Sequence, residues 1–108
     1  MSPEQEDRRR SHRVLLRTPV VLIWVQEGNV HREATHTLSV SKHGCAVLSH
    51  REFLLGSEIQ LENVTRGEMV RSRVVYTLKD FSTNMIEVGL SFLEERPGFW
   101  GIASVLSR

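Results

Sequence analysis

The sequence is short of several features that define whole classes of protein. It contains one cysteine, Cys45, so no intrachain disulfide can form and a reducing compartment is expected. The longest wholly apolar run is Val20 to Val25, far shorter than a membrane span. The polar first residues are not followed by the apolar region of a signal peptide. We therefore expect a cytoplasmic protein without a membrane span.

Patterns that indicate catalysis or metal binding are also missing. The sequence shows no carboxylate pair, G-x-S-x-G segment or phosphate-binding loop, so we predict that the chain is not an enzyme. Its five histidines form neither H-x3-H nor HExxH, and no cysteine pair stands near them. We predict no metal ion and no cofactor. Cys45 has no activating partner in the sequence and is expected to be a small core residue.

The composition is that of an ordinary globular protein. The chain has 108 residues, of which 40% are hydrophobic and 25% charged, which indicates one domain with a sufficient core. Net charge is only +1 and aromatic residues make up 6%, whereas a barrel that binds RNA or single-stranded DNA needs a wide basic surface with exposed aromatic rings. DNA and RNA are therefore not expected as partners.

Two polar segments predict an anion-binding site. Arginine outnumbers lysine twelve to two, and five arginines fall within ten residues: Arg8, Arg9, Arg10, Arg13 and Arg17. Guanidinium groups bind phosphate through paired donors and stack on flat rings. A second segment, Ser39 to Gly44, offers hydroxyls and a glycine that lets the backbone approach a ligand. A ligand with both phosphates and bases would use the two segments together.

Alternating apolar residues and turn signals predict an all-β fold, a small antiparallel β-barrel. The domain is expected to cover residues 13–108, after a flexible arm over residues 1–12 that carries the arginines. The expected strands are 14–25, 30–40, 45–48, 58–64, 68–78 and 85–93, with Pro19 marking an edge, a bulge or a strand start. Helical spacing of apolar residues after Pro97 predicts a short C-terminal helix.

Side-chain alternation also predicts which residues point into the barrel. One face of the second strand holds Ala34, His36, Leu38 and Val40, and one face of the fifth holds Val70, Ser72, Val74, Tyr76 and Leu78. Three apolar residues of the connector after Arg51 are expected to cover one end of the barrel: Phe53, Leu54 and Leu55. Apolar neighbours favour core packing over ligand stacking for Trp24 and Trp100.

The two polar segments resemble the motif pair of a known family. Arg9-x-x-x-Arg13 followed by Ser39-x-Ser41-x-x-Gly44 is similar to the RxxxR and (D/N)xSxxG motifs of PilZ domains, which are bacterial receptors for cyclic di-GMP. The resemblance continues along the chain, since Glu87 to Leu93 is similar to the family's last barrel strand and Phe99 to Ile102 to its closing segment. It implies a six-stranded antiparallel barrel that binds cyclic di-GMP.

The resemblance also implies roles for single residues. Arg9 and Arg13 would contact phosphates and guanine faces with help from Arg8, whereas Arg10 matches no motif position. Ser41 and Gly44 match the second motif directly. Ser39 stands where the family has Asp or Asn, and its hydroxyl offers one acceptor oxygen instead of a charged fork. Losing most of a bidentate base contact, worth about 1–3 kcal/mol, would weaken binding roughly ten- to hundredfold.

Two functions therefore remain open. In the first, the chain binds cyclic di-GMP and relays the signal by conformational change to an unidentified effector protein. In the second, it is a degenerate PilZ domain that binds no nucleotide and acts only through protein contacts. The substitution at Ser39 favours the second function, and the retention of Arg9, Arg13, Ser41 and Gly44 favours the first.

Overall fold

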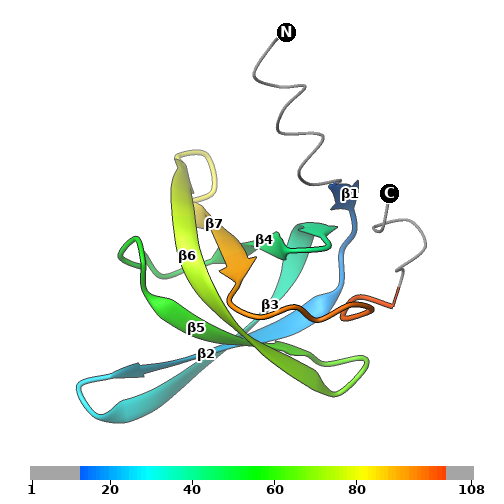
Figure 1. Cartoon of the computed structure of the whole chain (residues 1–108). Coiled ribbons are helices and arrows are strands. Elements are labelled where there is room, and N and C mark those ends of the chain that lie inside the picture. The colour runs from blue at the N-terminus through cyan, green and yellow to red at the C-terminus, as the bar shows by residue number, and fades with distance from the viewer. Residues whose placement is uncertain (1–12, 102–108) are drawn as a thin grey trace, which may run out of the picture.

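A computed structural model describes residues 13–101, which form seven β-strands (Figure 1). The strands are β1 (Val14–Leu15), β2 (Pro19–Gln26), β3 (Asn29–Ser41), β4 (Gly44–Ser49), β5 (Glu58–Asn63), β6 (Glu68–Asp80) and β7 (Met85–Phe92). The predicted arm over residues 1–12 lies outside the described residues. Within them, no helix is long and apolar enough to cross a membrane.

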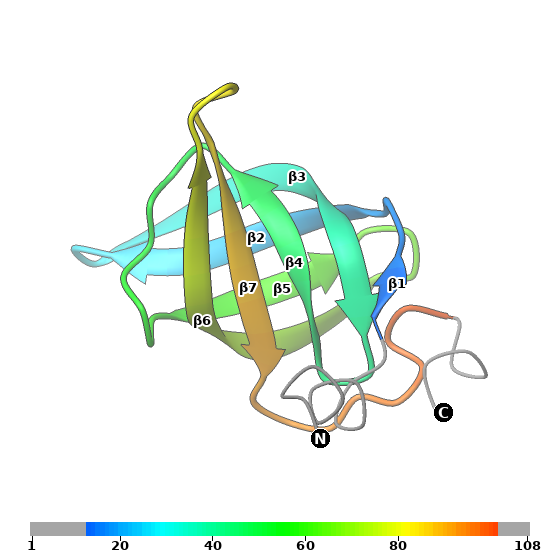
Figure 2. The ribbon, with the colours of Figure 1, turned by 90° about the horizontal axis from the view of Figure 1, so that it is seen from above.

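Six of the strands close into an antiparallel barrel. Around the ring, β2 pairs with β5, β5 with β6, β6 with β7, β7 with β4, β4 with β3, and β3 again with β2. Seen from above, β4 and β7 run side by side between β3 and β6 (Figure 2). The predicted six-stranded barrel is confirmed. The short strand β1 is an addition, and it pairs with the end of β3 at Ser39 and Val40.

The long strand β3 is shared between three partners. Its first part, Asn29 to His36, pairs with β2, and its last part pairs with β4 and β1 on opposite edges. Pro19 is the first residue of β2, a position where the missing N–H costs little, as the sequence suggested. The turn before β3 uses Glu27 and Gly28, both with positive φ, which suits a tight two-residue hairpin.

The barrel encloses a mainly apolar core, which also contains a few buried polar side chains such as Ser72. The buried core comprises Val20, Leu22, Val40, Cys45, Val47, Phe53, Ile59, Leu61, Val70, Val74, Ile86, Val88, Leu90, Phe99 and Trp100. The predicted inward positions Ile59, Leu61 and Val88 are each fully buried, and Cys45 is a core residue. Trp100 also lies in the core as predicted, whereas Trp24 is half-buried and packs against the core from outside.

Two β-bulges correct the predicted faces of β3 and β6. In β3 the register shifts between Thr37 and Ser39, so Thr37 and Val40 are both fully buried while Ala34 is exposed. In β6 the register shifts between Val74 and Tyr76. An extra residue in one strand reverses the alternation beyond it. Tyr76 therefore pairs with Gly89 on the outer face and does not share the inner face of Val74.

The connector between β4 and β5 covers the barrel end with one of its three predicted residues. Phe53 is buried, whereas Leu54 and Leu55 are 83% and 68% exposed. The backbone N–H of Gly56 donates to the carbonyl of Val74, and the N–H of Val74 donates to the carbonyl of Ser57. These bonds hold the connector along β6, so its apolar side chains cannot all turn inward.

The predicted C-terminal helix is wrong over the described residues. Pro97 to Trp100 form turns instead, and Gly98 and Gly101 adopt left-handed backbone conformations that interrupt a helix. Phe99 and Trp100 enter the core next to each other, and the Asn63 side-chain amide donates to the carbonyl of Phe99 at 2.8 Å. Phe99, the first residue of the predicted helical spacing, is thus buried in a turn. Residues 102–108 of the predicted helix lie outside the described residues.

Candidate ligand-binding site

The short strand β1 brings the two polar segments together. Leu15 pairs with Ser39, which places Arg13 at the end of β3 although 26 residues separate Arg13 from Ser39 in sequence. The Arg13 guanidinium donates through Nη1 to Ser39 Oγ at 3.4 Å, a long hydrogen bond. Arg13 is exposed and Ser39 is buried. Arg8 and Arg9 lie outside the described residues.

The second motif forms the turn between β3 and β4. The N–H of His43 donates to Ser41 Oγ at 3.3 Å, and this hydroxyl in turn donates to the carbonyl of Gly44 at 3.4 Å. Trp100 Nε1 donates to the carbonyl of Ser41 at 3.1 Å. The turn is therefore fixed both by its own serine and by the closing segment of the chain.

Gly44 is required by the packing of β4 against β7. A Cβ atom at this position would lie 2.0 Å from the carbonyl oxygen of Leu90, far inside any real contact. The φ angle of Gly44 is not in the left-handed region. The absence of a side chain, and not backbone freedom, therefore explains this glycine.

Four paired residues make a continuous row on the outside of the barrel. Ser39 pairs with Ala46, Ala46 with Gly89, and Gly89 with Tyr76. We call this row the outer shelf; it crosses β3, β4, β7 and β6, which lie in that order in Figure 2. The neighbouring residues along these strands point into the core: Val40, Cys45, Leu90 and Val74.

The shelf is buried in its middle and carries polar side chains at both ends. Ala46 and Gly89 carry almost no side chain, and a Cβ atom on Gly89 would lie 2.0 Å from Cε2 of Tyr76. The Tyr76 ring therefore lies directly against the backbone of β7. Its hydroxyl donates to Glu87 Oε2 at 2.7 Å, and the Arg13 side chain, which donates to Ser39, also lies close enough to this hydroxyl to lower its pKa. The middle of the row is therefore covered: the Tyr76 ring lies over Gly89, and Ala46 is only 1% exposed.

The charges at the shelf perturb two titratable groups. Burial raises the pKa of the Tyr76 hydroxyl, and the hydrogen bond and negative charge of Glu87 raise it further, while Arg13 acts in the opposite direction. Burial also raises the pKa of the Cys45 thiol well above its usual range, which Arg13 opposes only weakly. Cys45 therefore stays a neutral thiol, consistent with a core role.

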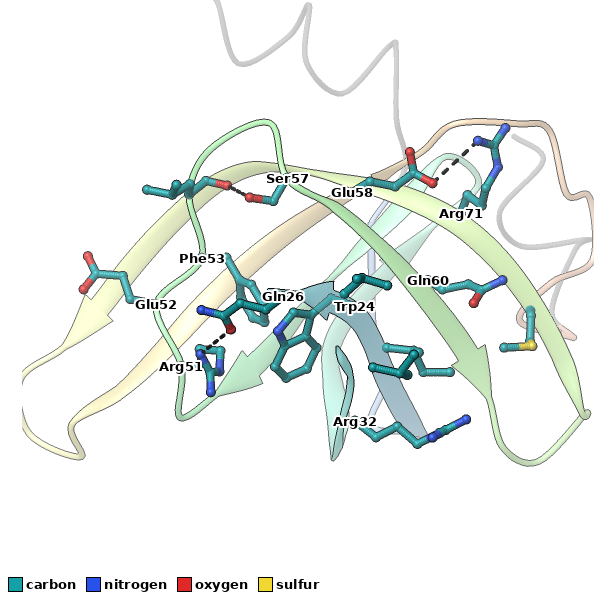
Figure 3. Close-up of a pocket in the computed structure, with 15 residues that line it drawn as sticks. Trp24, Gln26, Arg32, Arg51, Glu52, Phe53, Ser57, Glu58, Gln60 and Arg71 are labelled. Carbon is teal, nitrogen blue, oxygen red and sulfur yellow. Dashed lines mark hydrogen bonds and ion pairs between the residues drawn. The ribbon is translucent and has the colours of Figure 1, made fainter. Parts of the chain in front are cut away.

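A second recess lies elsewhere on the barrel and holds none of the predicted site residues (Figure 3). It encloses about 950 Å³ between β2, β3, β5, β6 and the connector after β4. The Arg51 guanidinium lies 5.2 Å from the Trp24 ring centre and donates to the Gln26 side chain at 3.1 Å. Trp24 also packs edge-on against Phe53 at 5.0 Å. In the part of the chain that the structure describes, no cluster of three or more metal-ligating side chains occurs.

The described residues thus form a six-stranded barrel in which Arg13 contacts Ser39 at the end of β3. The sequence profile of the PilZ domain matches residues 7–98, and the chain belongs to this family. No curated protein sequence is similar enough to this chain to count as a relative.

One solved structure illustrates the shared fold. It is the inhibitor of motility MotI/DgrA of Bacillus subtilis, with a TM-score of 0.67 and 19% sequence identity. The match covers 93% of this chain and 48% of the other protein, so this chain spans about half the length of that protein. The likeness supports the fold.

Proposed function

We propose that this chain is a receptor for cyclic di-GMP and relays the signal by conformational change to a protein partner. Membership of the PilZ family supports the ligand class. The observation that carries the proposal is the contact between Arg13 and Ser39, because it joins two motifs that lie 26 residues apart. Cyclic di-GMP presents phosphates and guanine rings together, which matches the paired donors and flat faces of clustered arginines.

Each motif residue has a proposed role in this site. Arg9 and Arg13 contact phosphate oxygens and guanine faces, and Arg8 assists them. Arg9 is four residues before Arg13, a span of at most about 14 Å, so both side chains can reach one dinucleotide. Ser39 and Ser41 supply hydroxyls at the shelf and its adjoining turn. Gly44 keeps β4 and β7 close together beside them.

The relay follows from charge. Cyclic di-GMP carries two negative charges, and binding would offset the repulsion among the clustered arginines. The segment that carries Arg9 would then be held against the outer shelf, which changes the surface that a partner meets. A ligand that binds one arrangement more tightly shifts the population toward it.

Calorimetric titration with cyclic di-GMP tests this proposal directly. We expect dissociation in the micromolar range or tighter for the unmodified chain, and at least about tenfold weaker binding for Arg9→Ala and Arg13→Ala. Arg17→Ala is the matched control, because Arg17 belongs to the same arginine cluster but to neither motif, and it should bind nearly normally. Absence of binding at about 1 mM ligand would refute a receptor function.

A protein-interaction module that binds no nucleotide is the second candidate. Ser39 favours it, because a hydroxyl replaces the family's Asp or Asn, and the Ser41 hydroxyl is already engaged within its own turn. If the unmodified chain does not bind, titration of Ser39→Asp follows. Binding gained by that variant would identify Ser39 as the cause.

A further inference from the structure

The end of the outer shelf opposite Ser39 carries a fixed carboxylate. Glu87 lies on β7 two residues before Gly89 and therefore points to the same outer face. Its Oε2 accepts the Tyr76 hydroxyl at 2.7 Å, and the Tyr76 ring is pressed against Gly89. Bulge formation in β6 is what turns Tyr76 outward to make this bond. The carboxylate is thus held at a defined place beside the Tyr76 ring.

Glu87 retains acceptor capacity after it binds Tyr76. An ionised carboxylate has about four lone-pair positions, and Tyr76 uses one. Among the described residues, no other donor contacts Glu87, which is half-buried. Its paired neighbours are apolar: Leu48 on β4 and Leu78 on β6, the latter 60% exposed. A carboxylate beside apolar surface suits a base, which has donors at its edge and a flat apolar face.

We propose that Glu87, oriented by Tyr76, accepts the N1–H and 2-amino hydrogens of a guanine of the bound cyclic di-GMP. Glu87 would thereby supply the acceptor that Ser39 cannot. Guanine presents these two donors side by side, and a carboxylate matches them with two acceptor oxygens. This inference rests on the proposed receptor function and adds a specificity-determining residue to it. Ser39 at one end of the shelf would then act together with Glu87 at the other, and Arg13 lies close to both Ser39 and the Tyr76 hydroxyl.

The test compares cyclic di-GMP with cyclic di-IMP, whose bases lack the 2-amino group, by calorimetric titration. The unmodified chain should prefer cyclic di-GMP by roughly tenfold or more, because a site built to accept a donor rejects a ligand without it. Glu87→Gln keeps an oxygen for the Tyr76 hydroxyl but replaces the second acceptor with a donor. It should weaken cyclic di-GMP binding roughly ten- to hundredfold and reduce the preference over cyclic di-IMP.

Two further variants separate base recognition from a structural role. Tyr76→Phe removes the hydrogen bond that orients Glu87 but keeps both the ring and the carboxylate. It should therefore weaken binding less than Glu87→Gln, which removes the acceptor itself. Equal losses in the two variants would mean that Glu87 acts only by holding Tyr76. Glu62→Gln, on the outer face of β5 between Val21 and Met69, is the control and should leave both affinities unchanged.

The possible results separate recognition of guanine by Glu87 from the receptor function on which it rests. If the unmodified chain binds cyclic di-GMP and Glu87→Gln retains both affinity and preference, Glu87 does not read guanine and the receptor function stands. If the unmodified chain binds neither dinucleotide, the receptor function fails and this inference fails with it. A preference that collapses in Glu87→Gln while Glu62→Gln keeps it would establish the assignment.

Discussion

Replacing Gly44 with alanine tests why the second motif ends in glycine. The new Cβ atom would lie 2.0 Å from the carbonyl oxygen of Leu90 and 3.2 Å from Cα of Ser91. Both atoms belong to the backbone of β7, which pairs with β4 at this point. Since Cβ contacts below 3.0 Å do not occur, the two strands must separate by about 1 Å.

The cost of that separation can be estimated from its parts. Forcing an extra methyl group into a packed site costs about 1–3 kcal/mol, and weakening one ladder hydrogen bond adds about 1 kcal/mol. We expect Gly44→Ala to lower the free energy of unfolding by about 2–4 kcal/mol, out of the roughly 5–15 kcal/mol typical of a domain. For a domain of this size, Tm should fall by roughly 10–20 °C.

Urea unfolding followed by tryptophan fluorescence measures this loss. Gly67→Ala is the control, because a Cβ atom there meets nothing within 4 Å but the residue has φ of 66°. Its cost should be only the left-handed backbone penalty of about 1 kcal/mol. If Gly44→Ala is no less stable than Gly67→Ala, close packing does not explain the glycine and a ligand contact becomes the better explanation.

Two further predictions concern the shelf and the closing turn. Tyr76 is the only tyrosine, so absorbance titration should report its pKa above 10.0, and Glu87→Gln should lower it; equal values would contradict the coupling. Because folding raises the pKa of Tyr76, its neutral hydroxyl stabilises the folded state. This contribution to the free energy of unfolding is complete below pH 10 and is lost as the pH rises through the pKa of Tyr76 in the folded protein. Asn63→Ala leaves the Phe99 carbonyl without its donor, so the free energy of unfolding should fall by about 1–3 kcal/mol in urea. A loss below about 0.5 kcal/mol would contradict that role.

The positions of the barrel strands could be predicted because strong alternation and turn residues mark most of the elements. Ile59 and Leu61 in β5 are examples, since each is flanked by polar residues and each is fully buried. The local pattern predicted a helix after Pro97, but Phe99, the one described residue of that pattern, is buried in a turn. The two left-handed glycines, Gly98 and Gly101, are the signal that should have counted against a helix.

The outer shelf could be predicted only at the end formed by Ser39. A β-bulge leaves no signature in the order of apolar and polar residues, so alternation assigned Tyr76 to the interior. Once Tyr76 is turned outward, Gly89 and Glu87 become parts of the same surface. Their role depends on pairing between β6 and β7, which is a long-range property. Likewise, the recess around Trp24 depends on how β2, β5 and the connector meet.

The structure divides the residues of the proposed site into two groups with different consequences for function. The barrel itself accounts for Ser41 and Gly44. The Ser41 hydroxyl fixes the turn between β3 and β4, and the missing side chain of Gly44 lets β7 pack closely against β4. Their presence is therefore expected in a nucleotide receptor and in a domain that binds no nucleotide alike. Arg13 and Glu87 are different: one is exposed, the other half-buried, and neither lies in the core. Under the proposed receptor function, variants of these two charged side chains should change the affinity for cyclic di-GMP while leaving the fold intact.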